Sequence, residues 1–285
     1  MTEPSISEFR SNITKFANET KLLSNYYEGM ELGEIWGFHI IGLFESDAEA
    51  KAYTSQVDQS YCNANLNGGW KAGDLKYADL DGDGVIGVGK NTLDEPGDRI
   101  YLGNSLPRLH YGFQTGFSWN NFDVSVFFEG TGNHYWYPAR YNFDFWGPYS
   151  LGYPAFLDKN FLANCWSEDN PDAYFPRPRS NVASNGGGEL GRVNDRYIQN
   201  IRYLRFKNLT VGYDIPKKIL SKVGIEGLRV YFSGENLAYW SPITKYTTHL
   251  DPESCFNRGD DPVDDLNNTS YPWQKTYMFG VDLTF

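Results

Sequence analysis

The sequence predicts an all-β protein built of antiparallel, up-and-down strands of the kind that cross an outer membrane. Three observations predict this class. Five segments alternate apolar and polar residues, near residues 109–119, 121–131, 201–213, 226–237 and 275–285. The connections between them alternate between short and long, and aromatic residues make up 17% of the chain. A membrane-spanning strand needs about 9–11 residues and turns every second side chain toward lipid.

Segment 275–285 shows the alternation most clearly. One face carries Tyr277, Phe279, Val281, Leu283 and Phe285, and the other carries Met278, Gly280, Asp282 and Thr284. The chain ends on an aromatic residue, although chain ends usually fray into water. A barrel strand explains this ending, because an aromatic side chain sits well at the membrane boundary. Taken alone, this segment also fits an edge strand of a soluble domain.

The other four segments repeat the pattern. Leu109, Tyr111, Phe113, Phe117 and Trp119 share one face of the first, and Phe122, Val124, Val126 and Phe128 share one face of the second. Leu228, Val230 and Phe232 do the same in segment 226–237. In segment 201–213 the alternation of apolar and polar residues shifts by one position near Asn208. This predicts a β-bulge, because one inserted residue moves the apolar side chains that follow it by one position in the alternation.

The lengths of the connections assign the two ends of the strands. Residues 120–121 and 214–224 form short turns, whereas 45–108, 131–200 and 238–274 form long loops. An outer-membrane barrel has short periplasmic turns and long outer loops. The order therefore predicts that all three long loops lie outside the cell, with the C-terminus on the periplasmic side.

Composition excludes other classes. No apolar run approaches 18 residues, which argues against a helical membrane protein. A net charge of −11 argues against nucleic acid as a partner, because phosphate binding needs a basic surface. Cys62, Cys165 and Cys255 lie in expected loops and leave room for one disulfide in an external compartment.

The N-terminal residues lack the basic and apolar regions of a secretory signal peptide. A barrel protein must be exported, so this start conflicts with the barrel-like end. We therefore expect the chain to be the C-terminal piece of a longer protein, without its signal peptide and plug.

Several short motifs occur in an order typical of one family. They are GMELGEIWGF at 29–38, GLFES at 42–46, GDLKYADLDGDGVI at 73–86, GDRIYLGNSLPRLHYGF at 97–113, FDVSVFFEG at 122–130, YLRFKNLTVGYDIPKKI at 203–219, LRVYFSGENLAYW at 228–240, DPE at 251–253 and YPWQKTYMFGVDLTF at 271–285. With these motifs the chain resembles the C-terminal third of a SusC/RagA-type, TonB-linked outer-membrane protein of the Bacteroidota, over nearly its whole length.

The resemblance implies a fold and a function. Such proteins are barrels of about 22 strands, closed by an N-terminal plug. They import glycans, oligosaccharides or peptides across the outer membrane, with energy supplied through TonB and with a SusD-like surface lipoprotein as a lid. The segments that hold the plug and contact TonB are not in this sequence, so we expect this chain alone to be unable to transport.

The last strand also resembles the signal read by the outer-membrane assembly machinery. The positions that match are Tyr277, Phe279, Gly280, Leu283 and Phe285. Met278 departs from the pattern, because a polar residue is usual there. The alternative is that Phe285 serves only as an anchor in lipid.

One loop has the spacing of a calcium site. Asp79, Asp81 and Asp83 form D-x-D-x-D-G with Gly84, and alternate carboxylates can converge on one hard cation. Lys90 occupies the position of the usual closing glutamate, so Asp94, Glu95 or Asp98 would have to complete the set. The alternative is a polar Asp/Gly turn, and we predict no other cofactor.

Trp136 and Trp146 are candidates for substrate contact, because they lie in an aromatic cluster within a long loop. Packing of the long loops is the alternative for both. No catalytic residues are predicted: nucleophile and zinc motifs are absent, and Asp251 and Glu253 are too close together in one loop to suggest a glycosidase pair.

Two other classes remain as alternatives. A secreted, calcium-dependent glycan-binding β-sandwich would need polar outward faces, which 275–285 lacks. A secreted glycosidase would need paired carboxylates at strand ends, and none stand out.

Overall fold

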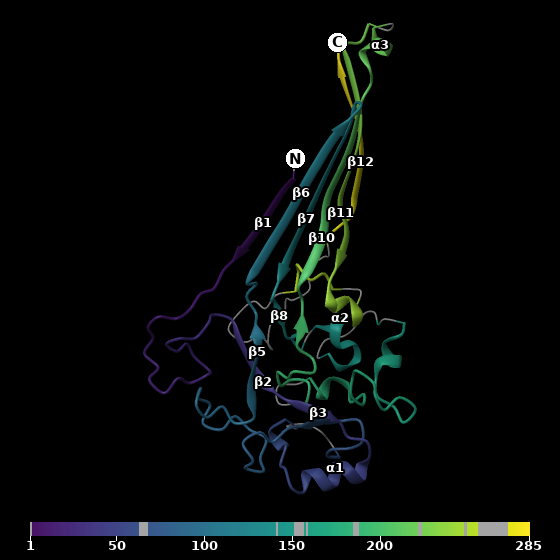
Figure 1. The fold of residues 1–285 in the computed structure, drawn as a ribbon. Coiled ribbons are helices and arrows are strands. Elements are labelled where there is room, and N and C mark those ends of the chain that lie inside the picture. The colour runs from purple at the N-terminus through teal and green to yellow at the C-terminus, as the bar shows by residue number, and fades with distance from the viewer. Residues whose placement is uncertain are drawn as a thin grey trace.

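The computed structural model describes residues 2–62, 68–140, 142–150, 157, 159–184, 188–221, 224–247, 250–255 and 273–285, and the account below concerns these residues. Long strands form a tall, curved sheet, and a lobe of loops and short elements lies at one end of it (Figure 1). Within the described residues, no helix has both the length and the apolar character needed to cross a membrane.

The sheet has six antiparallel strands in the order β1-β6-β7-β10-β11-β12. Their bounds are β1 Thr2–Glu8, β6 Leu109–Trp119, β7 Phe122–Gly132, β10 Tyr203–Asp214, β11 Gly227–Trp240 and β12 Thr276–Thr284. The prediction of an antiparallel all-β fold is confirmed. The last five strands start and end within three residues of the predicted segments.

Strand β1 was not expected from the sequence. It pairs with β6 from Thr2, opposite Thr115, to Glu8, opposite Leu109. All seven of its residues are exposed, and its sequence TEPSISE has little apolar alternation. Backbone pairing with a neighbour, rather than burial of side chains, therefore places this segment, and a pattern search does not detect that kind of strand.

The registers separate the two faces as predicted. Phe279 of β12 lies opposite Phe232 of β11, which lies opposite Val211 of β10. Val211 in turn lies opposite Val124 of β7. One face of the sheet therefore carries the apolar sets of all these strands, which we call the apolar face, and the opposite side is the polar face.

Local backbone geometry explains the turn and the bulge. Asn120 and Asn121 have φ values of 51° and 70°, as in the two-residue turns that match the twist of a hairpin. The register of β10 against both neighbours shifts between Phe206 and Asn208, which confirms the predicted bulge.

The short and long connections lie at opposite ends of the sheet, as Figure 1 shows. In its described part, the turn between β10 and β11 holds the single short helix α3 (Lys217–Leu220). The lobe contains the remaining elements. These are β2 Glu34–Phe38, β3 Ile40–Leu43, α1 Asp47–Thr54, η1 Ser60–Cys62, β4 Leu75–Tyr77, β5 Arg99–Asn104, β8 Tyr135–Trp136, α2 Phe143–Trp146, η2 Gly147–Tyr149, η3 Phe161–Asn164, η4 Ser180–Val182, β9 Gln199–Asn200 and η5 Pro242–Lys245.

The hydrophobic core lies in the lobe rather than beside the long strands. Phe38, Tyr77, Phe175 and Tyr197 are among its buried residues, and many of its contacts are edge-to-face or stacked aromatic pairs. The three long loops thus form a folded unit of their own. By contrast, no element among the described residues forms a second layer against the apolar face of the sheet (Figure 1).

Gly280 tests how tightly the sheet is packed. A Cβ at this position would lie 2.2 Å from Cζ of Tyr231, the residue directly opposite on β11. We expect Gly280→Ala to lower the free energy of unfolding by about 1–3 kcal/mol, because the Tyr231 ring must leave its place. Gly227→Ala is the matched control, since its Cβ would meet Thr284 at an ordinary 3.5 Å. Urea-dependent unfolding in detergent micelles measures both; equal losses would contradict the packing argument.

Candidate functional site

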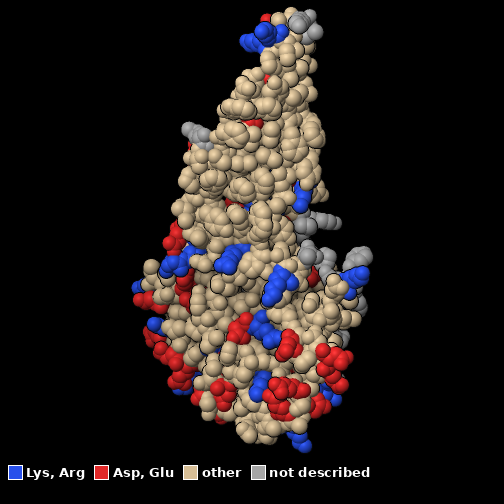
Figure 2. Space-filling model, turned by 45° about the vertical axis from the view of Figure 1, so that its right-hand side comes forward, with Lys and Arg blue, Asp and Glu red and all other residues tan. Residues whose placement is uncertain are grey.

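The apolar face is the first functional surface of the sheet. Trp119, Phe279 and Phe285 have 71%, 84% and 83% of their surface exposed. Figure 2 shows few charged residues along the strands and many over the lobe. A continuous apolar surface that extends over several strands is not stable in water unless a protein or a membrane covers it.

The polar face carries an ion pair that spans three strands. Nη2 of Arg229 on β11 lies 2.8 Å from Oδ2 of Asp123 on β7. The pair reaches across Gly212 of β10, where a Cβ would lie 2.4 Å from Nη2 of Arg229. Glycine at this position therefore makes room for the pair. Charged groups in lipid are costly, so this face must meet water or protein.

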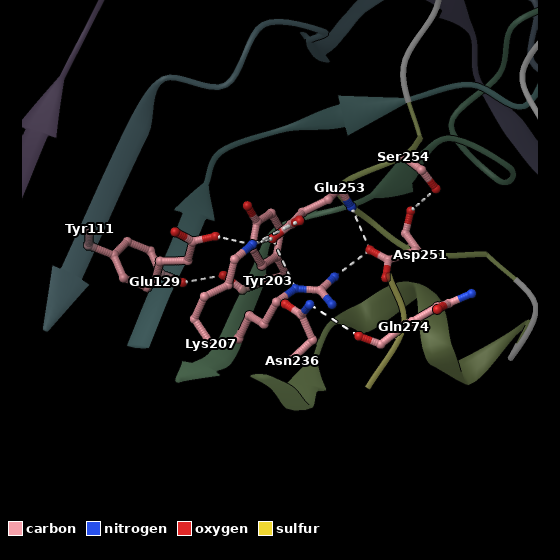
Figure 3. A network of polar contacts seen from close by, with 10 residues as sticks. Tyr111, Glu129, Tyr203, Lys207, Asn236, Asp251, Glu253, Ser254 and Gln274 are labelled. Carbon is pink, nitrogen blue, oxygen red and sulfur yellow. Dashed lines mark hydrogen bonds and ion pairs between the residues drawn. The ribbon is translucent and has the colours of Figure 1, made fainter. Parts of the chain in front are cut away.

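A buried network joins the sheet to the lobe (Figure 3). Arg205 of β10 donates from Nη2 to Oδ1 of Asp251 at 2.5 Å and from Nε to Oε1 of Glu253 at 2.9 Å. The side chains of Arg205 and Asp251 are each only 2% exposed. The loop that follows β11 is thereby fixed on the polar side of the sheet.

Lys207 extends the network toward β7. Its Nζ lies 2.7 Å from Oε1 of Glu129 and 3.4 Å from Oε1 of Glu253. Asp251 also accepts the backbone N–H of Glu253 at 3.0 Å. Asp251 and Glu253 therefore belong to one hydrogen-bonded turn, and both carboxylates also bind Arg205.

The two tryptophans proposed for substrate contact lie inside the lobe. Trp136 is 1% exposed and Trp146 is 0% exposed, and both pack edge-to-face on Phe145. Neither ring offers a face to solvent, so substrate contact by Trp136 and Trp146 does not agree with the structure. The packing alternative does, because the loops are long enough to build a core of their own.

The predicted calcium loop brings together a slightly different set of carboxylates. Oxygen atoms of Asp79, Asp81 and Asp98 lie within 4.8 Å of one another, without Asp83. Asp83 instead accepts the backbone N–H of Val85 at 2.7 Å. Asp98 is buried and accepts from the N–H groups of Leu80 and Gly87, and burial raises its pKa. Calcium binding at this loop stays a prediction, with Asp98 in the place proposed for Asp83.

The cysteines form no disulfide. Cys62, Cys165 and Cys255 are all buried, free thiols. Burial raises the pKa of the Cys62 thiol to about 12, so it is protonated at neutral pH. Inert, buried thiols of this kind are structural rather than reactive.

Strand β12 displays the residues of the predicted assembly signal. Tyr277, Phe279, Leu283 and Phe285 are exposed on the apolar face, and Gly280 lies on the opposite side beneath Tyr231. β12 is the last strand of the sheet order. Its outer edge has no partner strand among the described residues. Recognition by the assembly machinery stays a prediction.

The sequence has relatives among known proteins. No family model matches the sequence. TonB-dependent receptor P3 of Formosa agariphila is 27% identical over 266 residues, which cover 90% of this chain and 22% of the receptor. TonB-dependent receptor P26 of the same organism is 28% identical over 218 residues, covering 75% of this chain and 20% of the receptor.

The chain is related to the TonB-dependent receptors. It spans about a fifth of the length of the curated receptors that it matches.

Solved structures support this relationship at the level of the fold. The RagAB peptide transporter matches 100% of this chain and 27% of its own chain, with a TM-score of 0.61 and 20% identity. The RagAB peptide importer in its "open-open" state matches with a TM-score of 0.59 and 18% identity. The resemblance to SusC/RagA-type receptors that the motifs indicated is therefore confirmed.

Sequence reasoning missed the arginines that organise the polar face of this receptor-related chain. Arg205 and Arg229 occupy polar positions of alternating strands, where solvent exposure is the ordinary expectation. The sequence does contain a signal for the ion pair of Arg229. Once β7, β10 and β11 are placed side by side, Arg229 shares its face of the sheet with Asp123 and Asp214. The partners of Arg205 come from a distant loop and left no such signal.

Proposed function

We propose that this chain forms part of the wall and the outer loops of an outer-membrane TonB-dependent transporter. The transporter imports glycans, oligosaccharides or peptides, together with a SusD-like surface lipoprotein. The observation that carries the proposal is the division of the sheet into one apolar and one polar face, with every long loop at one end. The apolar face meets lipid, the polar face lines the interior, and the lobe faces outward.

The relatives support the same assignment in kind. Two of them are named as TonB-dependent receptors, and the structural neighbours are described as a peptide transporter and importer. In our proposal TonB engages a region outside this chain, so energised transport belongs to a larger assembly. The free edge of β12 and the short strand β1 are where further barrel strands would pair, since an open edge is costly in lipid.

The test is a map of the environment around β12. We expect spin labels at 277, 279, 281 and 283 to be reached by oxygen and shielded from a water-soluble nickel complex. Labels at 278, 282 and 284 should show the reverse pattern. The protein is labelled through single introduced cysteines in isolated outer membranes, with the buried native thiols as an unmodified background. Period-two accessibility is expected only where one face meets lipid.

The same map separates the proposal from a secreted, calcium-dependent glycan-binding β-sandwich. In such a module the apolar face would be packed against a second sheet, so labels at 277, 279, 281 and 283 would be shielded from both reagents. The proposal fails if both faces are equally open to the nickel complex.

A further inference from the structure

A hollow of about 360 Å³ opens on the lobe, separate from the Arg205 network and from the acidic loop. It lies where η3, the chain near Tyr174, Arg196 and η5 meet. Its lining residues are Asn164, Asp172, Tyr174, Arg196, Lys245 and Tyr246. This volume is at the lower end of small-molecule sites, which measure about 300–1,000 Å³.

Two stacked tyrosines form a fixed wall of this pocket. The rings of Tyr174 and Tyr246 lie 3.9 Å apart with an interplanar angle of 14°. The hydroxyl of Tyr174 accepts a hydrogen bond from Gln199 at 2.9 Å and donates to the carbonyl of Arg196 at 3.2 Å. The wall is therefore in place before any ligand arrives, which lowers the entropic cost of binding.

Each tyrosine ring covers one face of the other, and further protein groups surround both rings. Tyr174 contacts the rings of Phe175 and Tyr197 edge-on, at 4.9 Å and 5.3 Å. Nζ of Lys245 lies 5.1 Å from the ring centroid of Tyr246. A sugar ring would need a free aromatic face on which to stack, so the pocket does not favour a neutral saccharide.

The charges of the pocket favour an anion. Arg196 donates from Nε to the carbonyl of Tyr174 at 3.0 Å and from Nη2 to that of Ala173 at 2.7 Å, which fixes the guanidinium. Among the described residues, neither Arg196 nor Lys245 has a carboxylate within 4.0 Å, and Asp172 has no cation within that distance. Two cations thus face one carboxylate in a chain whose net charge is −11.

We propose that this pocket binds the C-terminal carboxylate of a short peptide. Arg196 and Lys245 supply charge-assisted hydrogen bonds to the carboxylate, and Asn164 and Asp172 accept from peptide N–H groups. The assignment rests on the transport function proposed above and deepens it, because it selects peptides from the substrate classes named there.

Calorimetry with the receptor purified from outer membranes in detergent tests the proposal. Trialanine with a free carboxylate is compared with trialanine amide, which differs only in that charge. We expect the amide to bind at least about tenfold more weakly, because it cannot accept the charge-assisted bonds. Lys245→Gln should weaken binding of the acid about tenfold and leave the amide unchanged.

Matched controls keep the result interpretable. Lys51→Gln removes an exposed lysine from α1, in the same lobe, and should change neither affinity. Arg196→Gln is a second variant, and its fold is checked by tryptophan fluorescence because Arg196 also holds two backbone carbonyls. Equal affinity for acid and amide, or tighter binding of trigalacturonate than of trialanine, would overturn the peptide assignment. The spin-label map is independent of ligand, so it shows whether the transport proposal fails as well.

Discussion

Replacing Arg205 by methionine is expected to destabilise the junction between sheet and lobe by about 3–5 kcal/mol. The substitution leaves Asp251, whose side chain is 2% exposed, buried without its cation. Glu253 loses the Nε hydrogen bond at the same time. Urea-dependent unfolding in detergent measures the total loss, and hydrogen exchange at residues 250–255 locates it.

Lys207→Met is the matched control on the same strand. Lys207 and Glu129 are paired at 2.7 Å, but their side chains are 23% and 32% exposed. Solvent therefore screens them, and the expected loss is below about 1 kcal/mol. A double variant, Arg205→Met with Asp251→Leu, should recover most of the stability, because no buried charge is then left alone. If Arg205→Met and Lys207→Met lower the free energy of unfolding equally, burial does not give the Arg205–Asp251 pair its expected importance.

Glu189→Gln is expected to remove a pH dependence from the stability of the lobe. Glu189 is fully buried, and its Oε2 accepts from the N–H of Leu75 at 3.0 Å. Burial, reinforced by the nearby carboxylate of Asp74, raises its pKa to about 8. Asp74 itself is paired with Arg179, whose Nε donates at 2.7 Å.

The sign of the effect follows from proton linkage. The folded lobe holds the proton of Glu189 more tightly than the unfolded chain, whose glutamate has the ordinary pKa of 4.5. The stabilisation is complete below that value and is lost as the pH rises toward about 8, with a slope of up to about 1.4 kcal/mol per pH unit. A neutral glutamine keeps an acceptor for Leu75 without this dependence.

The measurement is urea unfolding followed by the buried tryptophans of the lobe between pH 5 and pH 9. Wild type should lose on the order of a few kcal/mol over this range relative to Glu189→Gln. Glu168→Gln, an exposed glutamate of the same lobe, should retain the wild-type profile. An unchanged slope in Glu189→Gln would assign the pH dependence to another group.

The sequence predicts the long strands well, because their side chains report directly on two different surroundings. Leu228, Val230 and Phe232 alternate with polar residues since one face meets an apolar medium, and even the bulge near Asn208 follows from a change of parity. Strand β1 shows no such alternation, because backbone pairing with β6 alone holds its sequence TEPSISE in the sheet.

The lobe is harder to predict for a physical reason. Trp136 and Trp146 look like ligand contacts when their loop is considered alone, but segments far apart in the chain supply the rings that cover them. Asp98 joins Asp79 and Asp81 only after the loop folds back, and the choice of Asp98 over Asp83 depends on which backbone N–H groups each carboxylate binds. Long-range contacts of this kind leave no local pattern.

The bulge beside Lys207 has a consequence for how the long loops can vary. Strands β6 and β7 pair without a shift, and the register of β10 against β7 and β11 shifts only between Phe206 and Asn208, at the end near the lobe. Insertions and deletions in the outer loops can therefore be absorbed above this level without moving a side chain from one face to the other. In the transporter proposed above, the sequence of the outer loops can therefore change while the pairing of the wall strands stays the same.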